Sequence, residues 1–130
     1  MKTILVIDDE YALVESLTDL LEEEGYRVVS AANGKDGLTR VMKENPDLII
    51  TDFMMPIADG LELVRGVRAL PTFQAVPVVM MSASDMTVVL SNRRLKLSAF
   101  LSKPFQADEL MGLVRKLIGK GERRRAAAGK

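Results

Sequence analysis

The chain has 130 residues, enough for one domain whose core buries roughly two thirds of the unfolded surface. Its 18 basic and 18 acidic residues give a formal net charge of zero, so overall charge does not indicate nucleic acid as a partner. The sequence contains no cysteine, which excludes a disulfide framework and a Cys-based metal site or nucleophile. It also contains no histidine, which excludes the usual zinc ligand and a phosphohistidine.

Ten short apolar segments follow one another along the chain. In chain order, expected strands at 3–7, 26–31, 47–51, 76–81 and 99–101 alternate with helices whose apolar stripes lie within 13–21, 38–42, 61–67, 85–95 and 110–118. Gly25, Asn45-Pro46 and Pro71 are expected to end the first three helices, and Asp108 favours the start of the last. Continuous apolar strands that alternate with helices predict an α/β fold, with a parallel sheet covered on both faces.

The end of the chain differs in composition from the rest. Residues 111–130 hold seven basic residues and one acid, and "GKGERRRAAAGK" has no apolar residue larger than alanine. We therefore expect one domain over residues 1–118 and a basic, disordered tail over 119–130. No apolar run approaches the roughly 20 residues of a membrane span, and no signal peptide precedes the first strand, so we expect a cytoplasmic protein without membrane association.

Polar residues stand at the carboxyl ends of four predicted strands, the edge at which open α/β sheets bind ligands. Asp8-Asp9-Glu10 follow the first strand, Asp52 the third, Ser82 the fourth and Lys103 the fifth. Each has an ordinary explanation alone: the acids as a helix cap or a turn start, Ser82 as a strand-end hydroxyl, and Lys103 as a surface charge.

Together these residues indicate a different chemistry. If the first and third strands are neighbours, Asp8, Asp9 and Asp52 meet, and three adjacent carboxylates need a cation to ionise together. Oxygen ligands without histidine or cysteine favour Mg²⁺. With Lys103 as a positive charge and Ser82 as a hydroxyl donor, the set suits phosphoryl transfer to a carboxylate.

The sequence resembles the response-regulator receiver domains of two-component signalling over residues 2 to about 118. The motifs "VIDDE", "TDFMMPIADG", "VVMMSAS" and "AFLSKPF" occur in the family's order. The resemblance implies a flavodoxin-like, doubly wound (βα)5 sandwich with strand order 2-1-3-4-5.

The resemblance also implies a role for each motif. Asp52 would accept a phosphoryl group, Asp9 would bind Mg²⁺ directly, and Asp8 would bind it mainly through water. The carbonyl of Met54 would be a further ligand, and Lys103 would pair with Asp52, before a cis Lys103–Pro104 bond. Ser82 and Phe100 would be the switch residues, and the pair Pro56 and Gly60 would shape the loop after Asp52.

The implied partners are a sensor histidine kinase or a histidine phosphotransferase, and a downstream protein target or output domain. Movement of Ser82 would let Phe100 turn inward and alter the face formed by the fourth helix, fifth strand and fifth helix. That face is also where a homodimer would form, and no direct nucleic-acid binding is expected. The resemblance fits both a stand-alone receiver and part of a longer regulator, and it implies a signalling protein rather than an enzyme with a separate substrate.

The sequence departs from the family pattern at two places. Lys96 stands where glycine is usual, which costs on the order of 1 kcal/mol at a left-handed helix end and puts the end of the fourth helix in doubt. Met54 and Ser84 occupy positions that tune the phosphoryl lifetime in this family, and the apolar Met54 predicts slow dephosphorylation.

Two other functions remain to be weighed. An aspartate-nucleophile phosphatase of the haloacid-dehalogenase type is disfavoured, because Met54 stands in place of the second acid of the D-x-D pattern. A receiver-like interaction module that ignores phosphorylation keeps the same fold, and the presence of all the acids, Ser82 and Lys103 argues against it.

Overall fold

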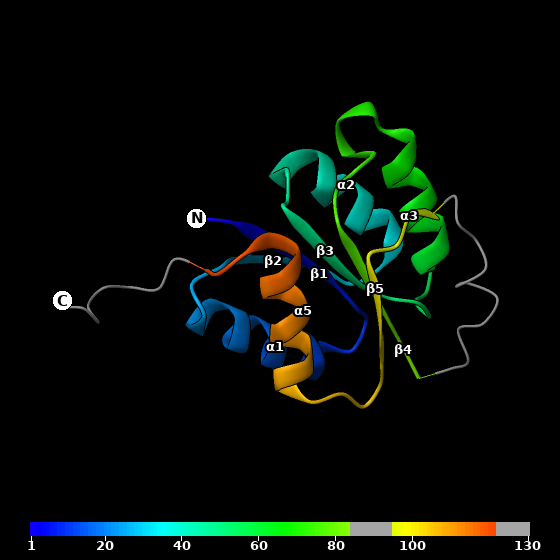
Figure 1. Cartoon of the computed structure of the whole chain (residues 1–130). Helices are drawn as coiled ribbons and strands as arrows, with labels where there is room; N and C mark the ends of the chain where they lie inside the picture. Colours follow the sequence, from blue (N-terminus) through cyan, green and yellow to red (C-terminus); the bar gives the residue numbers. More distant parts are fainter. Residues whose placement is uncertain (84–94, 122–130) are drawn as a thin grey trace.

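The computed structural model describes residues 1–83 and 95–121, and its centre is one five-stranded sheet (Figure 1). All the strand pairs are parallel, in the order β2-β1-β3-β4-β5. The strands are β1 (Thr3–Ile7), β2 (Arg27–Ala31), β3 (Leu48–Asp52), β4 (Val78–Ser82) and β5 (Ala99–Ser102). The predicted α/β class and strand order are confirmed; β1 has its predicted ends, and the other strands differ from prediction by one or two residues at an end.

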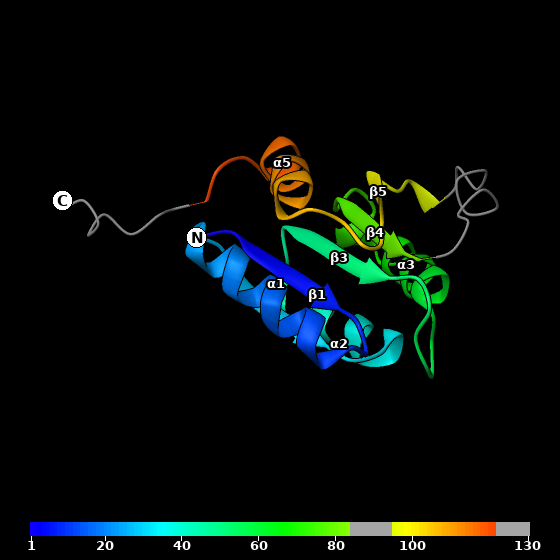
Figure 2. The same ribbon diagram turned by 90° about the horizontal axis from the view of Figure 1, so that it is seen from below.

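Helices cover both faces of the sheet (Figure 2). They are α1 (Tyr11–Glu23), α2 (Gly34–Glu44), α3 (Gly60–Ala69), the short 3-10 helix η1 (Pro71–Phe73) and α5 (Ala107–Ile118). The apolar residues of α1 and α5 pack on one face, and those of α2 and α3 pack on the other. The helix predicted within 85–95 lies outside the described residues, apart from Leu95.

The strands β1, β3 and β4 are buried along their whole length, as their continuous apolar sequences predicted. Alternate residues of each strand point to opposite faces and join two separate clusters. On β5, for example, Leu101 packs with α1 and α5, whereas Phe100 packs with the cluster of α2 and α3.

The helices begin and end at residues with specific capping roles. Gly25 has a φ of 95° just after α1, and Asn45 caps α2 in the left-handed conformation, so both predicted ends are confirmed. At the start of α3, Asp59 and Glu62 form a reciprocal capping box. Pro71 follows α3 and opens η1. These helix ends place the connecting loops at the amino and carboxyl ends of the strands.

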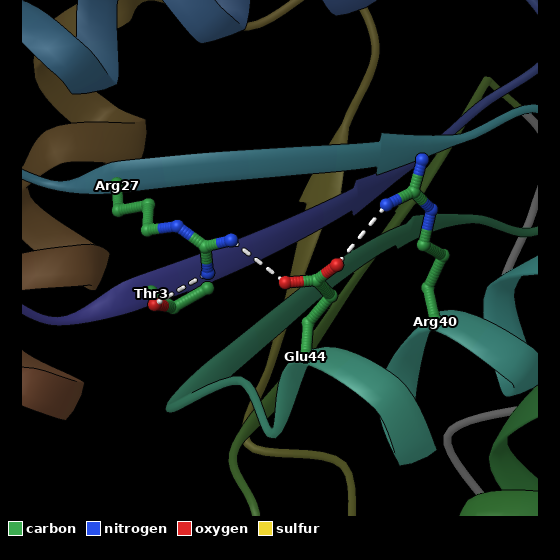
Figure 3. Close-up of polar contacts among 4 residues, drawn as sticks. All are labelled: Thr3, Arg27, Arg40 and Glu44. Carbon is green, nitrogen blue, oxygen red and sulfur yellow. Dashed lines mark hydrogen bonds and ion pairs between the residues drawn. The ribbon is translucent and has the colours of Figure 1, made fainter.

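A surface network joins the edge strand β2 to the end of α2 (Figure 3). Glu44 receives Arg27 at 2.7 Å and Arg40 at 3.2 Å, and Arg27 also donates to the hydroxyl of Thr3. The hydrogen bond from Arg27 lowers the pKa of Glu44. Because the side chains of Arg27 and Arg40 are 48% and 43% exposed, these ion pairs add little stability.

The chain after α5 stays in contact with the domain at the amino ends of the strands. The hydroxyl of Tyr26 donates to the carbonyl of Gly119 at 2.5 Å, and Lys2 donates to the carbonyl of Ile118. Arg115 of α5 pairs with Glu24 at 3.2 Å. The predicted boundary between residues 118 and 119 stays a prediction, since described contacts continue past it and residues 122–130 lie outside the description.

In the described parts of the chain, none of the helices combines the length and the apolar character that crossing a membrane requires.

Candidate functional site

Three carboxylates meet at the carboxyl ends of two neighbouring strands. Asp8 directly follows β1, Asp52 is the last residue of β3, and Ile7 pairs with Thr51 in the register of these strands. Oxygen atoms of Asp8, Asp9 and Asp52 all lie within 4.8 Å of one another. The sequence-based expectation that these acids share one pocket is therefore met by the geometry.

Asp8 is buried and held by three hydrogen bonds. Its backbone N–H donates to the carbonyl of Ala31, and one carboxylate oxygen accepts the N–H of Glu10 at 2.9 Å. The other oxygen accepts the ammonium of Lys103 at 2.9 Å. The N-cap residue of α1 is Glu10, so neither Asp8 nor Asp9 serves as the helix cap that the simpler explanation required. Asp9 itself is exposed.

Lys103 connects the two buried acids. Its ammonium lies 2.9 Å from Asp8 and 3.2 Å from Asp52, and its side chain is 19% exposed. The backbone N–H of Lys103 donates to the carbonyl of Ser82, which places the lysine beside the end of β4. The predicted cis Lys103–Pro104 bond is present. The sequence pointed to the pair with Asp52, whereas the closer contact, with Asp8, was not foreseen.

Burial and charge change the pKa values of the site in a consistent way. Burial raises the pKa of Asp52, and the charge of Asp8 raises it further, against the opposing effect of Lys103 and the Phe53 N–H. For Lys103, burial lowers the pKa, but the hydrogen bond to Asp8 and the charges of both acids raise it more. One lysine therefore does not fully balance the carboxylates, and the pocket favours an additional cation.

The donor set fits Mg²⁺. It consists of carboxylate oxygens from Asp8, Asp9 and Asp52, with neither nitrogen nor sulfur ligands in the cluster. Hard cations prefer such oxygens, and Mg²⁺ commonly uses one or two carboxylates together with water and a phosphoryl oxygen. The exposed side of Asp9 leaves the cluster open to solvent on one side, as a hydrated ion requires.

The remaining predicted residues surround this pocket at different depths. Ser82 ends β4 and is 2% exposed, and Phe100 lies on β5 opposite Met80, half-buried. Met54 follows Asp52 by two residues and is 62% exposed. Ser84 lies outside the described residues. The roles of these residues as ligand, donor and switch stay predictions.

The loop from Asp52 to α3 is held at both ends. The N–H of Gly60 donates to the carbonyl of Phe53, and a side chain at Gly60 would meet the carbonyl of Asp52 at 2.6 Å. The N–H of Ala58 donates to the carbonyl of Pro56 at 2.8 Å, and Ile57 between them has a φ of 72°. This is a γ-turn, and the positive φ is strained for a β-branched residue. The segment between Pro56 and Gly60 thus shapes the loop, as expected.

The start of α2 supports this loop from the side. The N–H of Gly34 donates to the carbonyl of Ala58 at 3.0 Å, and a Cβ at Gly34 would lie 2.3 Å from that oxygen. Only glycine allows so close an approach. The sequence gave no signal for this contact, because it joins residues 24 positions apart through their backbones.

A largely apolar groove of about 340 Å³ opens beside Lys103. The start of α1 contributes Glu10 and Leu13, and the segment after β5 contributes Pro104 and Phe105. Sequence analysis did not predict it, although "KPF" with an apolar residue early in α1 is the pattern from which it is built.

Comparison with known proteins assigns the family. The response regulator receiver domain model matches residues 4–115. The chain therefore belongs to the receiver domains of two-component response regulators.

Individual relatives agree with this assignment. The chain is 37% identical to response regulator Rre1 of Synechocystis. The match covers 91% of this chain but only 52% of the length of Rre1. It is 31% identical to sporulation initiation phosphotransferase F of Bacillus subtilis, covering 88% of this chain and 92% of that protein.

Two solved structures show the same fold. The response regulator TrrA of Thermotoga maritima, solved in complex with Mg²⁺ and BeF, is 34% identical, with a TM-score of 0.80 over 91% of this chain and 100% of TrrA. The chemotaxis response regulator CheY4 of Vibrio cholerae is 26% identical, with a TM-score of 0.84 over 91% of this chain and 99% of CheY4.

Proposed function

We propose that this chain accepts a phosphoryl group on Asp52 from a sensor histidine kinase or a histidine phosphotransferase, in a Mg²⁺-dependent reaction. The observation that carries the proposal is Lys103, whose ammonium bridges Asp8 and Asp52 in a pocket of three carboxylates. The solved Mg²⁺–BeF complex of the related TrrA supports both the metal and the phosphoryl chemistry.

In this reaction a carboxylate oxygen of Asp52 attacks the phosphorus. The bond from phosphorus to the donor's imidazole nitrogen breaks, a bond to the Asp52 oxygen forms, and the nitrogen keeps the electron pair. Asp8, Asp9 and Asp52, with the carbonyl of Met54, would hold Mg²⁺, and the ion would supply positive charge for the transferred group. Lys103 already lies 3.2 Å from Asp52 and stabilises the negative charge that arrives there.

Ser82 and Phe100 carry the response to phosphorylation. A phosphoryl group adds acceptors and negative charge beside the buried Ser82, whose hydroxyl turns toward it. Phe100, which is half-buried, then turns inward and changes the face formed by the fourth helix, β5 and α5. A downstream protein or output domain binds this face, where a homodimer also forms.

The groove beside Lys103 is the surface on which the phosphoryl donor docks. Leu13, Pro104 and Phe105 supply an apolar patch immediately next to the charged pocket. A helical donor with an apolar face around its histidine would bury this patch and exclude water from the reaction.

We further propose that the protein acts in the cytoplasm, with the receiver domain at residues 1–118 and the basic tail beyond it.

Incubation with acetyl phosphate and Mg²⁺, followed by intact-mass analysis, tests the proposal. We expect one phosphoryl adduct on the wild type, none on Asp52→Asn, and none on the wild type in EDTA. Asp19→Asn, a change at an exposed aspartate of α1, is the matched control and should label normally. An unlabelled wild type that also gives no spectral change with beryllofluoride would favour the phosphorylation-independent module instead.

A further inference from the structure

Arg68 makes an unusual set of contacts far from the acidic pocket. It lies in the last turn of α3, and its guanidinium donates to three backbone carbonyls. These are Phe73 of η1 at 2.9 Å, and Leu95 and Lys96 at 3.0 Å each. Arg68 is partly buried, and this burial lowers the pKa of its guanidinium. No carboxylate pairs with it among the described residues.

The segment that Arg68 holds leads directly into β5. Lys96 has a φ of 52°, the left-handed conformation that glycine adopts without cost. Backbone carbonyls outside regular secondary structure need hydrogen-bond donors, and the guanidinium of an arginine can supply several. The two hydrogen bonds from Arg68 to Leu95 and Lys96 therefore offset the absence of glycine. Two residues later, Ser98 anchors the segment to Val78 through its N–H and its hydroxyl.

The same segment contributes to the apolar cluster against which Phe100 packs. Leu95 is buried in the cluster of α2 and α3, and Leu97 and Phe100 pack against that cluster from its edge. Phe100 is partly exposed there, and in the proposed function this packing is the arrangement that Phe100 leaves on turning inward. A fixed Leu95–Lys96 turn therefore stabilises the outward arrangement of Phe100.

We propose that Arg68 is a positioning residue for the switch: by clamping the Leu95–Lys96 turn, it favours the outward packing of Phe100 and opposes activation. This inference rests on the proposed phosphoacceptor function. Lysine at position 68 keeps the charge but loses the planar fork that binds several carbonyls at once, so it removes the clamp without removing the cation.

The test is a beryllofluoride titration of the full chain with Mg²⁺, followed by the ¹H–¹⁵N signals of residues 97–101. We expect Arg68→Lys to reach half-saturation at a three- to tenfold lower beryllofluoride concentration than the wild type, since less of the binding free energy is spent on leaving the outward packing. Arg65→Lys, an exposed position on the same helix, should leave the midpoint unchanged.

A second substitution separates positioning from stability. Leu17→Ala removes buried volume from the cluster of α1 and α5, on the opposite face of the sheet from the turn, and should lower the melting temperature while leaving the midpoint unchanged. A midpoint that Leu17→Ala lowers as much as Arg68→Lys does, or one that Arg68→Lys leaves unchanged, would overturn the inference while the phosphoacceptor proposal stands. A wild type that does not respond to beryllofluoride would overturn both.

Discussion

Removing one carboxylate from the acidic pocket should stabilise the metal-free protein. The oxygens of Asp8, Asp9 and Asp52 lie within 4.8 Å of one another, and a pair of charges at that separation repels by about 3.5 kcal/mol at an effective dielectric constant of about 20. The ammonium of Lys103 lies 3.2 Å from Asp52, and the attraction between the two charges is about 5 kcal/mol at the same dielectric constant. The two repulsions that Asp52 experiences outweigh this single attraction, and burial adds to the cost.

We therefore expect Asp52→Asn to increase the free energy of unfolding by about 1–3 kcal/mol in EDTA at pH 7, since part of the repulsion involves the exposed Asp9 and is screened. Urea unfolding followed by circular dichroism measures the difference. Mg²⁺ should stabilise the wild type and have little effect on Asp52→Asn, because the variant lacks one of the ligand charges. Asp19→Asn serves as the control for loss of one negative charge.

The pH dependence gives an independent check on the cause. The folded-state pKa of Asp52 lies above its ordinary value of 3.8, so protonation stabilises the folded state. The stabilisation that protonation of Asp52 provides is complete at pH values below 3.8, and it is lost as the pH rises through the raised folded-state pKa. The advantage of Asp52→Asn should thus shrink as the pH falls from 7 toward 4. A variant that is less stable than the wild type in EDTA at pH 7 would refute the electrostatic reasoning.

Four further substitutions, one of them a control, concern the loop after Asp52 and the glycine that supports it. Gly34→Ala should cost about 1–3 kcal/mol in urea unfolding, because its Cβ would overlap the carbonyl of Ala58, whereas Gly112→Ala, with open space around it on α5, should gain about 1 kcal/mol. Ile57→Gly should add about 1 kcal/mol by relieving the positive φ, and an unchanged unfolding midpoint would show that the turn is not strained. Met54→Asn should shorten the phosphoryl lifetime about tenfold, because the amide would orient an attacking water. The expected factor is smaller than the rate gain that a fully positioned general base contributes. Timing the loss of the phosphoryl label measures this lifetime.

The fold was predictable because its signals are local. Continuous apolar runs marked the strands, and Gly25 and Asn45 marked helix ends with the φ values that the structure shows. Convergence of Asp8 and Asp52 required only that β1 and β3 be neighbours, which the sheet order provides. A site built at strand ends is thus legible in sequence, because parallel strands bring their carboxyl ends to one edge.

The contacts that could not be predicted depend on side-chain reach or on close backbone approach. The ammonium of Lys103 lies nearer to Asp8 than to Asp52, which depends on how the chain turns after β5. Arg68 contacts carbonyls 27 and 28 residues further along the chain, and backbone carbonyls carry no sequence signature. The expected difficulty at Lys96 was correctly located, but its compensation by an arginine on another helix required three-dimensional information.

The contacts around Tyr26 also bear on how the protein can be handled experimentally. Lys2 and Tyr26 hold the end of α5 at the amino ends of the strands, the edge opposite to Asp52 (Figure 1). A fluorophore, a surface tether or a fused reporter attached at Met1 or next to Ile118 would therefore lie at the opposite end of the strands from the acidic pocket. Immobilising the chain through such an attachment leaves the pocket facing solution, where a phosphoryl donor can reach it.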